Sequence, residues 1–595
     1  MSNKTNYDER AQWQWWLVFI GAPIAVFLGT IGYWSTHGPT ANIKTWQDAL
    51  YGAFQLLVMR TTQVDSVPWT LEWARWIGAV VFGSVIFVTA LRFFPGSLRR
   101  LLLQCPWPSQ VVILGLGPMT TQLVRCYRKQ GRHVVVVAPT ADAEGVEGIR
   151  GHGVALVSGN LAESATLVKA RVYRASHVIA LAAEDSTNMA IVDAARKLIR
   201  KTTCRYIPGR QHLVKCFVHL SNVDARASLQ ASKAFSGEPR CEIRFFDLFD
   251  AAARKLLLDS ELTPLDHGGI TEQDARQVHL VILGFGRMGQ TIALRAAQLG
   301  HFANRKPLRI SVIDQQAERQ RQALLFRYPN FEKTCQFEYH AFPVESVSAR
   351  QKLEEWCADK TKAVSVATCF DRDSLGLEVA LRMKAMLQEY QVPMFVRMSS
   401  ASGFAAVLQD GTVAPTSQVH AFGMVEDCCG EDVLENKLNE DLAQAIHGDY
   451  CVEKSEAIRR KGGDPAAELS TRKWAELDEG LKDSNRQQAD HIDIKLRAIG
   501  LERVSTADPR PAVERLGPDE IELLAEVEHN RWNAERWLQG WTPGARDLKK
   551  KVTPYLVPWC ELPADIKPYD RTTVGKIPEF LRTVNQKACR KVVKP

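Results

Sequence analysis

A complete G-x-G-x-x-G pattern lies in the middle of the chain, in "HLVILGFGRMGQTIALRAAQLG" at Gly284, Gly286 and Gly289. Such glycines permit a tight turn and bring the start of the next helix close to a phosphate. Asp314 ends the following apolar run, close to the ~20-residue distance at which an acid binds ribose hydroxyls. Arg287 within the turn could add a phosphate contact. The pattern predicts nucleotide binding; the alternative is that the glycines only close a strand-to-helix turn.

An earlier stretch, "SQVVILGLGPMTTQLVRCYRKQGRHVVVVAP", has the same layout, with Gly115 and Gly117 in the turn. An apolar run, a glycine turn, an amphipathic helix and a second apolar run predict the β-α-β opening of a Rossmann unit. Thr120 replaces the third glycine, and the second run ends in Ala138–Pro139 rather than in an acid. The fold is therefore predicted for both copies, and nucleotide binding mainly for the second.

The tandem units resemble the RCK (TrkA-N) regulators of potassium channels and transporters. The segment "HVIALAAEDSTNMAIVDAAR" is similar to the family's acidic pair followed by T-N and a helix, and "AVSVATCFDRDSLGLEVALRMK" is a looser second copy. Gly159–Asn160 stands where the family often has a G-D pair. The resemblance implies regulatory binding of an NAD- or adenine-type nucleotide.

The C-terminal part contains a predicted helix, "DEIELLAEVEHNRWNAERWLQGW", which Gly540 should end. The stretch "TPYLVPWCELPADIKPYDR" has too many prolines for regular elements, so packing of Tyr555, Trp559 and Tyr569 should hold it. Together with "GWTPGARD", these segments resemble the ryanodine-receptor repeat (RyR domain). Bacterial members of that family are suspected of sensing nucleotide-derived ligands.

Side chains suited to such a ligand occur in this part. Aromatic rings stack on bases, and arginines pair with phosphates. The candidate ligand residues are Asn485, Arg486, His529, Arg531, Trp532 and Trp541. Alternatively the tryptophans form the core of a small helical domain, and Arg486 makes an ordinary surface ion pair.

Two apolar segments near the N-terminus, residues 15–34 and 76–94, are long enough to span a bilayer and carry aromatic residues at their ends. Arg92, Arg99 and Arg100 place the far end of the second segment in the cytoplasm. We expect a bacterial inner-membrane protein with both termini in the cytoplasm.

The connection "DALYGAFQLLVMRTTQVDSVPW" occupies the position of a pore helix and its filter. The following loop contains Arg60, Thr61, Thr62 and Asp65 but no G-Y-G, so a potassium-selective carbonyl ladder is not expected. Charged residues repeated around a ring could set the ion preference instead. The alternative is an amphipathic helix on the outer surface.

The predicted fold class is an α-helical transmembrane hairpin with a re-entrant pore helix, two α/β Rossmann-like RCK domains and a mostly α-helical RyR domain. The expected domain boundaries are 1–104, 105–262, 263–435 and 436–595. The 13 cysteines form no C-x-x-C pair and the 14 histidines are dispersed, so no metal site is predicted. No catalytic set is recognisable, and the net charge of +8 with no basic stripe does not favour nucleic acid.

These features predict a ligand-gated ion channel or channel-like effector rather than an enzyme. By resemblance, such chains assemble as homotetramers around a pore, and a role in stress or phage defence through depolarisation is suspected. The alternative function is a non-conducting, membrane-anchored nucleotide sensor or scaffold. The predicted partners are the lipid bilayer, other copies of the chain and a small nucleotide-derived ligand.

Overall fold

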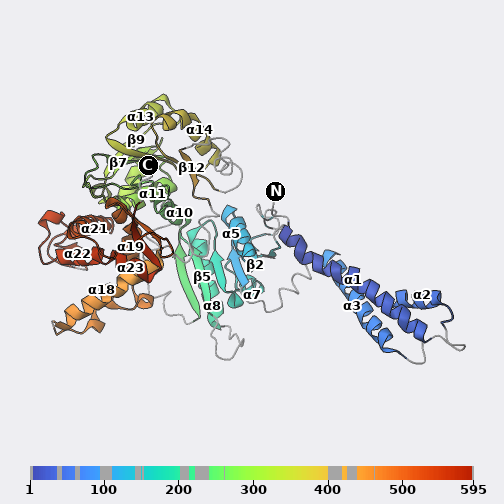
Figure 1. Ribbon diagram of the computed structural model, residues 1–595. Helices are drawn as coiled ribbons and strands as arrows, with labels where there is room; N and C mark the ends of the chain where they lie inside the picture. The colour runs from blue at the N-terminus through green and yellow to red at the C-terminus, as the bar shows by residue number, and fades with distance from the viewer. Residues whose placement is uncertain are drawn as a thin grey trace. The chain divides into compact units, whose positions relative to one another are not determined.

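The computed structural model divides the chain into two compact units, Met1–Pro108 and Ser109–Pro595. It describes residues 5–36, 43–60, 67–93, 110–140, 146, 149, 153–201, 213–220, 229, 240–259, 261–399, 418–424, 439–460, 462–547 and 549–591. Among these residues, the first unit shows three helices, and the second shows two six-stranded parallel sheets and a mostly helical C-terminal part (Figure 1).

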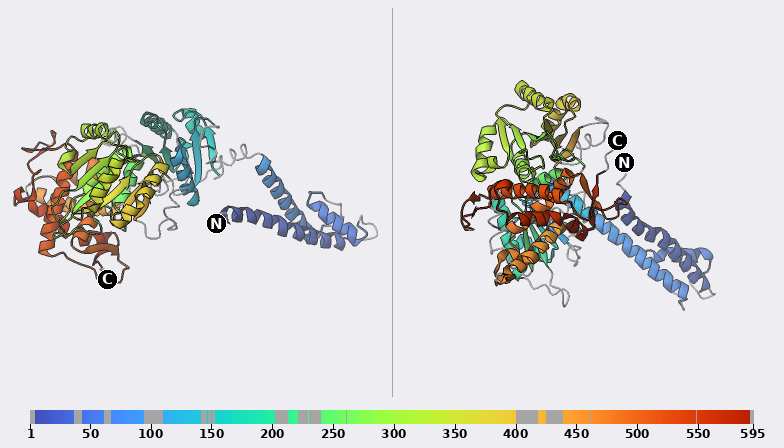
Figure 2. Two further views of the ribbon diagram at one scale, coloured as in Figure 1. Left: turned by 90° about the horizontal axis from the view of Figure 1, so that it is seen from above. Right: turned by 60° about the vertical axis from the view of Figure 1, so that its left-hand side comes forward.

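The described helices of the N-terminal unit are α1 (Thr5–Ser35), α2 (Trp46–Leu56) and α3 (Trp69–Phe93). Helices α1 and α3 run side by side in every view (Figure 2), and α2 packs on both. Thr45 and Asp48 form a capping box that starts α2. No described helix is both long enough and apolar enough to cross a membrane, in contrast to the two predicted spans. Helix α3 begins well before residue 76, so Glu72 and Arg75 belong to it.

The first sheet is parallel, with strand order β3-β2-β1-β4-β5-β6. Its strands are β1 Gln110–Leu114, β2 His133–Ala138, β3 Ala155–Ser158, β4 His177–Ala180, β5 Val214–His219 and β6 Cys241–Phe246. The accompanying helices are α5 Pro118–Lys129, α7 Ser164–Lys169, α8 Asp185–Lys201 and α10 Leu248–Leu257. This is the doubly wound Rossmann order, which confirms the fold predicted from the first glycine turn.

The second sheet repeats this topology, in the order β12-β11-β10-β7-β8-β9. Its strands are β7 Gln277–Leu283, β8 Arg309–Ile313, β9 Gln336–His340, β10 Lys362–Thr368, β11 Met394–Arg397 and β12 Val419–Phe422. The helices are α11 Arg287–Leu299, α12 Ala317–Arg327, α13 Val347–Ala358 and α14 Asp373–Glu389. Because β7 and β10 lie side by side and the chain departs from them in opposite directions, the ligand crevice of the fold is expected at their carboxyl ends.

The C-terminal part is mostly helical. It contains α18 Glu440–Arg460, α19 Glu479–Asp490, α20 Ile492–Ala498, α21 Pro518–Leu538, α22 Lys567–Gly575 and α23 Ile577–Thr583. Its short strands pair as β13 Leu501–Ser505 with β16 Gln586–Arg590, and β14 Thr542–Pro543 with β15 Val552–Thr553. Gly540, at φ +79°, follows α21 as predicted.

Two expectations for the proline-rich stretch were wrong. Residues Lys567–Arg571 open the regular helix α22, because Pro568 lies in its first turn, where a missing N–H costs nothing. Tyr569 is 52% exposed and does not hold the stretch together, whereas Trp559 is buried as expected.

Polar contacts join the C-terminal helices to the Rossmann elements. Arg254 on α10 donates from Nε and Nη2 to the Asp490 carboxylate on α19, at 2.6 and 2.8 Å, and both side chains are buried. Arg497 on α20 pairs with buried Asp266. The three cytoplasmic domains expected from the sequence therefore lie within one compact unit.

Candidate functional site

The second glycine turn lies at the carboxyl end of β7. Its three positions differ in whether the fold requires a glycine there. Gly284 has φ +88°, a backbone conformation that favours glycine. A Cβ on Gly289 would lie 2.3 Å from the Gly284 carbonyl oxygen, so α11 can approach the strand only with glycine there. Gly286 has φ −64°, and a Cβ on it would meet no described atom within 4 Å. The chain itself therefore requires Gly284 and Gly289 but not Gly286.

Asp314 directly follows β8, beside this turn. Its Oδ2 accepts a hydrogen bond from the Phe285 backbone N–H at 2.7 Å, and its Oδ1 accepts one from Gln316 N at 2.6 Å. The carboxylate is half-buried and fixes the turn, while each oxygen keeps a further lone pair for a ribose hydroxyl. The structure thus places the predicted acid against the glycine turn.

Arg287, the first residue of α11, points to a carboxylate of the neighbouring helix. Its Nη2 lies 3.1 Å from Asp247 Oδ2, and its guanidinium lies 4.4 Å from the Phe249 ring centre. Arg397, at the end of β11, covers the same ring at 5.3 Å. Asp247, Phe249 and Arg397 were missed from the sequence, because none lies in a motif. The packing of α10 on α11 brings Asp247 and Phe249 to the turn, whereas Arg397 reaches the Phe249 ring from the end of β11.

The first glycine turn differs from the second at the third glycine position, as its sequence predicts. Thr120 is buried in the place of the third glycine and donates its hydroxyl to the Gly115 carbonyl at 3.0 Å. A Cβ on Gly115 would lie 2.5 Å from the Leu181 carbonyl oxygen, whereas a Cβ on Gly117 would meet no described atom within 4 Å. The described residues directly after β2 are Pro139 and Thr140, so no carboxylate stands at the position that Asp314 occupies in the second copy.

The asparagine of the T-N pair in the RCK-like segment holds two strand ends together. Asn188 is fully buried; its side chain accepts from Ala182 N at 2.7 Å and donates to the carbonyls of Ala182 and His219. It therefore ties the ends of β4 and β5 together at the carboxyl edge of the first sheet.

Both candidate arginines of the RyR-like part are held by acids. Arg531 is 2% exposed and pairs with Glu528 and Glu535, each at 2.9 Å. Burial opposes ionisation of Glu528, but Arg531 and Lys495 outweigh it and lower the pKa of this carboxyl. Arg486 pairs with Glu440 at 2.6 Å. A ligand phosphate would have to displace these carboxylates.

Asn485 donates its side-chain amide to the Leu481 carbonyl within its own helix. This hydrogen bond does not connect Asn485 to the aromatic candidates. His529 stacks on Trp532 with ring centres 5.8 Å apart and contacts the Val557 carbonyl through Nε2. Arg536 lies 5.2 Å from the Trp532 ring and 5.1 Å from the Trp541 ring. Arg536, which sequence reasoning missed, therefore joins three of the predicted ligand residues in one half-buried stack.

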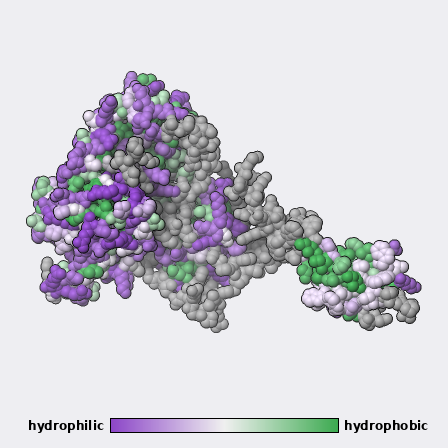
Figure 3. All heavy atoms as spheres, in the orientation of Figure 1, coloured by the Kyte–Doolittle hydropathy of each residue, from purple (hydrophilic) through white to green (hydrophobic). Residues whose placement is uncertain are grey.

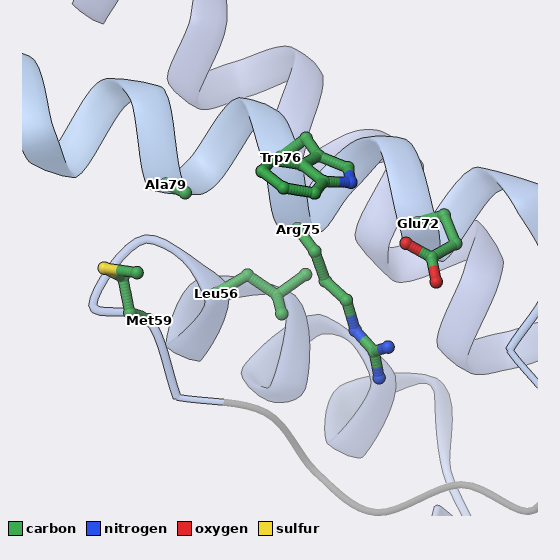
Figure 4. Close-up of a pocket in the computed structure, with 6 residues that line it drawn as sticks. All are labelled: Leu56, Met59, Glu72, Arg75, Trp76 and Ala79. Atoms are coloured by element: carbon green, nitrogen blue, oxygen red, sulfur yellow. The ribbon is translucent and has the colours of Figure 1, made fainter.

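The predicted pore loop is only partly described: Arg60 follows α2, and Thr61, Thr62 and Asp65 lie outside the described residues. Nearby, a cavity of about 280 Å³ is lined by Leu56, Met59, Glu72, Arg75, Trp76 and Ala79. Figure 4 shows the Arg75 side chain extending from α3 toward α2, with the Glu72 carboxylate nearby. These two charged side chains were not among the predicted pore residues.

Metal chemistry has no candidate site in the part of the chain that the structure describes, where no group of three His, Cys, Asp or Glu side chains is placed to hold an ion.

Comparison with protein families gives two matches. The TrkA-N domain model matches residues 111–207, which include β1 to α8, and the RyR domain model matches residues 518–588. Both resemblances seen in the sequence are confirmed over these residues. No curated protein matches the chain.

Similar solved structures include two of GsuK and one of an enzyme. "GsuK channel bound to NAD" is 15% identical, at a TM-score of 0.36, and the match covers 74% of this chain and 86% of that one. GsuK bound to ADP is 16% identical, at 0.35, covering 73% and 100%. A dipicolinate synthase polypeptide from Bacillus halodurans is 13% identical, at 0.20, covering 56% and 97%. At these TM-scores the similarities do not establish a shared function.

Proposed function

We propose that residues 109–595 form a nucleotide-sensing regulatory unit whose second Rossmann sheet binds an NAD- or adenine-type nucleotide. We further propose that this unit gates an ion-conducting pore built by the N-terminal helices of several copies, most simply four, in a bacterial inner membrane.

The observation that carries the nucleotide proposal is the open space over Gly286. Its φ suits any residue, and a Cβ there would meet no described atom within 4 Å. Backbone strain and close packing therefore do not explain why this residue is a glycine. The middle glycine of a Rossmann turn allows a pyrophosphate to approach the backbone. The α11 N-terminus, Arg287 and Asp314 surround the same turn. A nucleotide explains this set better than turn closure alone.

The membrane proposal is supported by the apolar side chains that are exposed on the N-terminal helices. Large apolar side chains are exposed along one face of α1 at Ile20, Ile24, Phe27 and Ile31. Along α3, Trp69, Trp73, Trp76 and Val80 are likewise exposed. On α2, small Ala49 and Ala53 face inward while Trp46, Tyr51 and Phe54 face outward. Such a surface needs lipid or another chain to cover it, and Figure 3 shows hydrophobic residues on its visible face.

In this mechanism the nucleotide shifts an existing equilibrium between closed and open pores. It does so only by the difference in its affinity for the two states. The loop after α2 lacks the glycines of a potassium filter, so the conductance should discriminate weakly between potassium and sodium.

A flux assay on the purified full chain in liposomes tests the proposal. Addition of ADP or NAD should change the rate of both potassium and sodium flux, while Gly286→Asp protein should show no nucleotide response. A chain that binds nucleotide but never conducts would instead be a membrane-anchored sensor or scaffold. A chain that neither conducts nor binds would overturn the whole proposal.

A further inference from the structure

The start of α10 lies over the second glycine turn. Asp247 caps α10, with its Oδ1 accepting from Phe249 N at 2.9 Å, and it is only 5% exposed. Its other oxygen, Oδ2, lies 3.1 Å from Arg287 Nη2. One turn further along α10, Asp250 binds Arg295 of α11 through two hydrogen bonds of 2.6 and 2.8 Å. Two ion pairs therefore join α10 to α11, and only the Asp247 pair lies at the turn.

The Phe249 ring contacts two guanidinium groups at the carboxyl edge of the second sheet. Arg287 is the first residue of α11, and Arg397 is the last residue of β11. Arg397 donates from Nη1 to the Phe370 carbonyl at 3.0 Å and to Asp371 Oδ1 at 2.6 Å. Phe370 follows β10. Its ring lies so close to the glycine turn that a Cβ on Gly284 would be 2.9 Å from the ring carbons Cδ1 and Cε1. Both cations thus stand at the β7–β10 crevice, where ligands of this fold bind.

A carboxylate bound to the first arginine of a helix occupies a position suited to a phosphate. The helix N-terminus favours anions, and a guanidinium binds carboxylate and phosphate oxygens with the same geometry. In this structure the anion on Arg287 is Asp247 of the chain itself. A nucleotide phosphate at the turn would compete for the same guanidinium.

We propose that Asp247 is an internal competitor of the ligand: the pyrophosphate of a nucleoside diphosphate or dinucleotide takes Arg287 from Asp247, with Arg397 as the second cation. This inference rests on the proposed nucleotide site. Asp247 keeps its cap hydrogen bond from Phe249 N after the exchange, and His219 Nε2 lies 4.0 Å from its Oδ1. The exchange removes one of the two ion pairs between α10 and α11.

The exchange has a direct path to the C-terminal helices. Helix α10 carries Asp247 at its start and Arg254 in its last turn, and Arg254 binds Asp490 of α19. Ligand binding at the turn thereby loosens one end of the helix whose other end holds the RyR-like part.

Calorimetric titration of the full chain with ADP tests the competition. Asp247→Asn keeps an oxygen for the cap but lacks the charge that holds Arg287, so the Kd for ADP should fall about fivefold. Arg287→Ala should weaken binding, and adding Asp247→Asn to it should change nothing further, because the competition needs both side chains. Asp250→Asn is the matched control: it breaks the other α10–α11 ion pair and should leave the Kd unchanged.

Asp247→Ser, which also retains the cap, replaces Asp247→Asn if that protein does not fold. An unchanged or higher Kd in the cap-preserving variant, or an equal effect with and without Arg287, would overturn the competition while leaving the nucleotide site in place. Absence of ADP and NAD binding by the unmodified chain would overturn the nucleotide site itself and the competition with it.

Discussion

At the scale of single residues, Arg531 is held in a buried cluster of acids. Guanidinium groups bind phosphates, so the sequence favours Arg531 as a phosphate ligand. The structure buries Arg531 between Glu528 and Glu535, which lie within about one turn of it on the same helix. No sequence motif predicts this burial. Arg536, which lies nearly one and a half turns further along, contacts the predicted tryptophans and belongs to no motif. Spacing alone does not tell which side of a helix is buried.

The Arg531 cluster gives a residue-scale prediction. Removing one partner of a buried ion pair leaves an uncompensated charge, so Arg531→Ala should lower the free energy of unfolding by about 3–5 kcal/mol. Exposed Arg546→Ala, the control, should change it by less than about 0.5 kcal/mol. Chemical denaturation of both variants provides the measurement. Unchanged stability together with weaker nucleotide binding would instead make Arg531 a ligand residue.

At the scale of elements, the strands, the glycine turns and α21 were predictable because local patterns define them. Apolar runs became β1, β2, β7 and β8, and Gly540 ended its helix as expected. The start of α22 was missed because proline was counted as a helix breaker, although it is tolerated in a first turn. The docking of α10 on α11, which shapes the second crevice, depends on long-range packing and leaves no local pattern.

A buried histidine between two strands predicts a pH dependence. His279 on β7 is 0% exposed and contacts Ser311 Oγ on β8 at 2.7 Å. Burial, reinforced by Arg309, lowers its pKa to about 3. The folded state therefore binds fewer protons than the unfolded state between about pH 6.5 and 3, so stability should fall as the pH decreases through this window.

Since one pKa unit corresponds to about 1.4 kcal/mol, the full loss from this one group is about 5 kcal/mol, and it is complete only below pH 3. His279→Gln should be less stable at neutral pH but should lose less stability between pH 6.5 and 4.5 than the unmodified chain. Thermal unfolding at a series of pH values measures the two slopes. Parallel slopes would show that His279 is not held neutral in the folded state.

At the scale of the whole molecule, the proposed function joins an N-terminal helical unit to a nucleotide-sensing unit. The expectation from exposed apolar side chains is that the chain stays with membranes. After alkaline carbonate extraction, the full chain should remain in the membrane pellet, and Ile24→Asp/Phe27→Asp should be released in part, because charges on that face oppose lipid contact. Phe326→Ser, at an 88% exposed position on α12, is the control and should behave as the unmodified chain. Complete release of the unmodified chain would contradict the membrane proposal.

Calorimetric titration of the full chain and of its Gly286→Asp variant with ADP and NAD decides whether the second Rossmann crevice binds a nucleotide. Aspartate at this position is a good helix cap and has open space around it, so the variant should unfold at the same temperature as the unmodified chain. Its carboxylate would crowd and repel a pyrophosphate. We predict saturable binding by the unmodified chain and none by the variant. Equal binding by both, or binding by neither, would show that the nucleotide does not bind over Gly286.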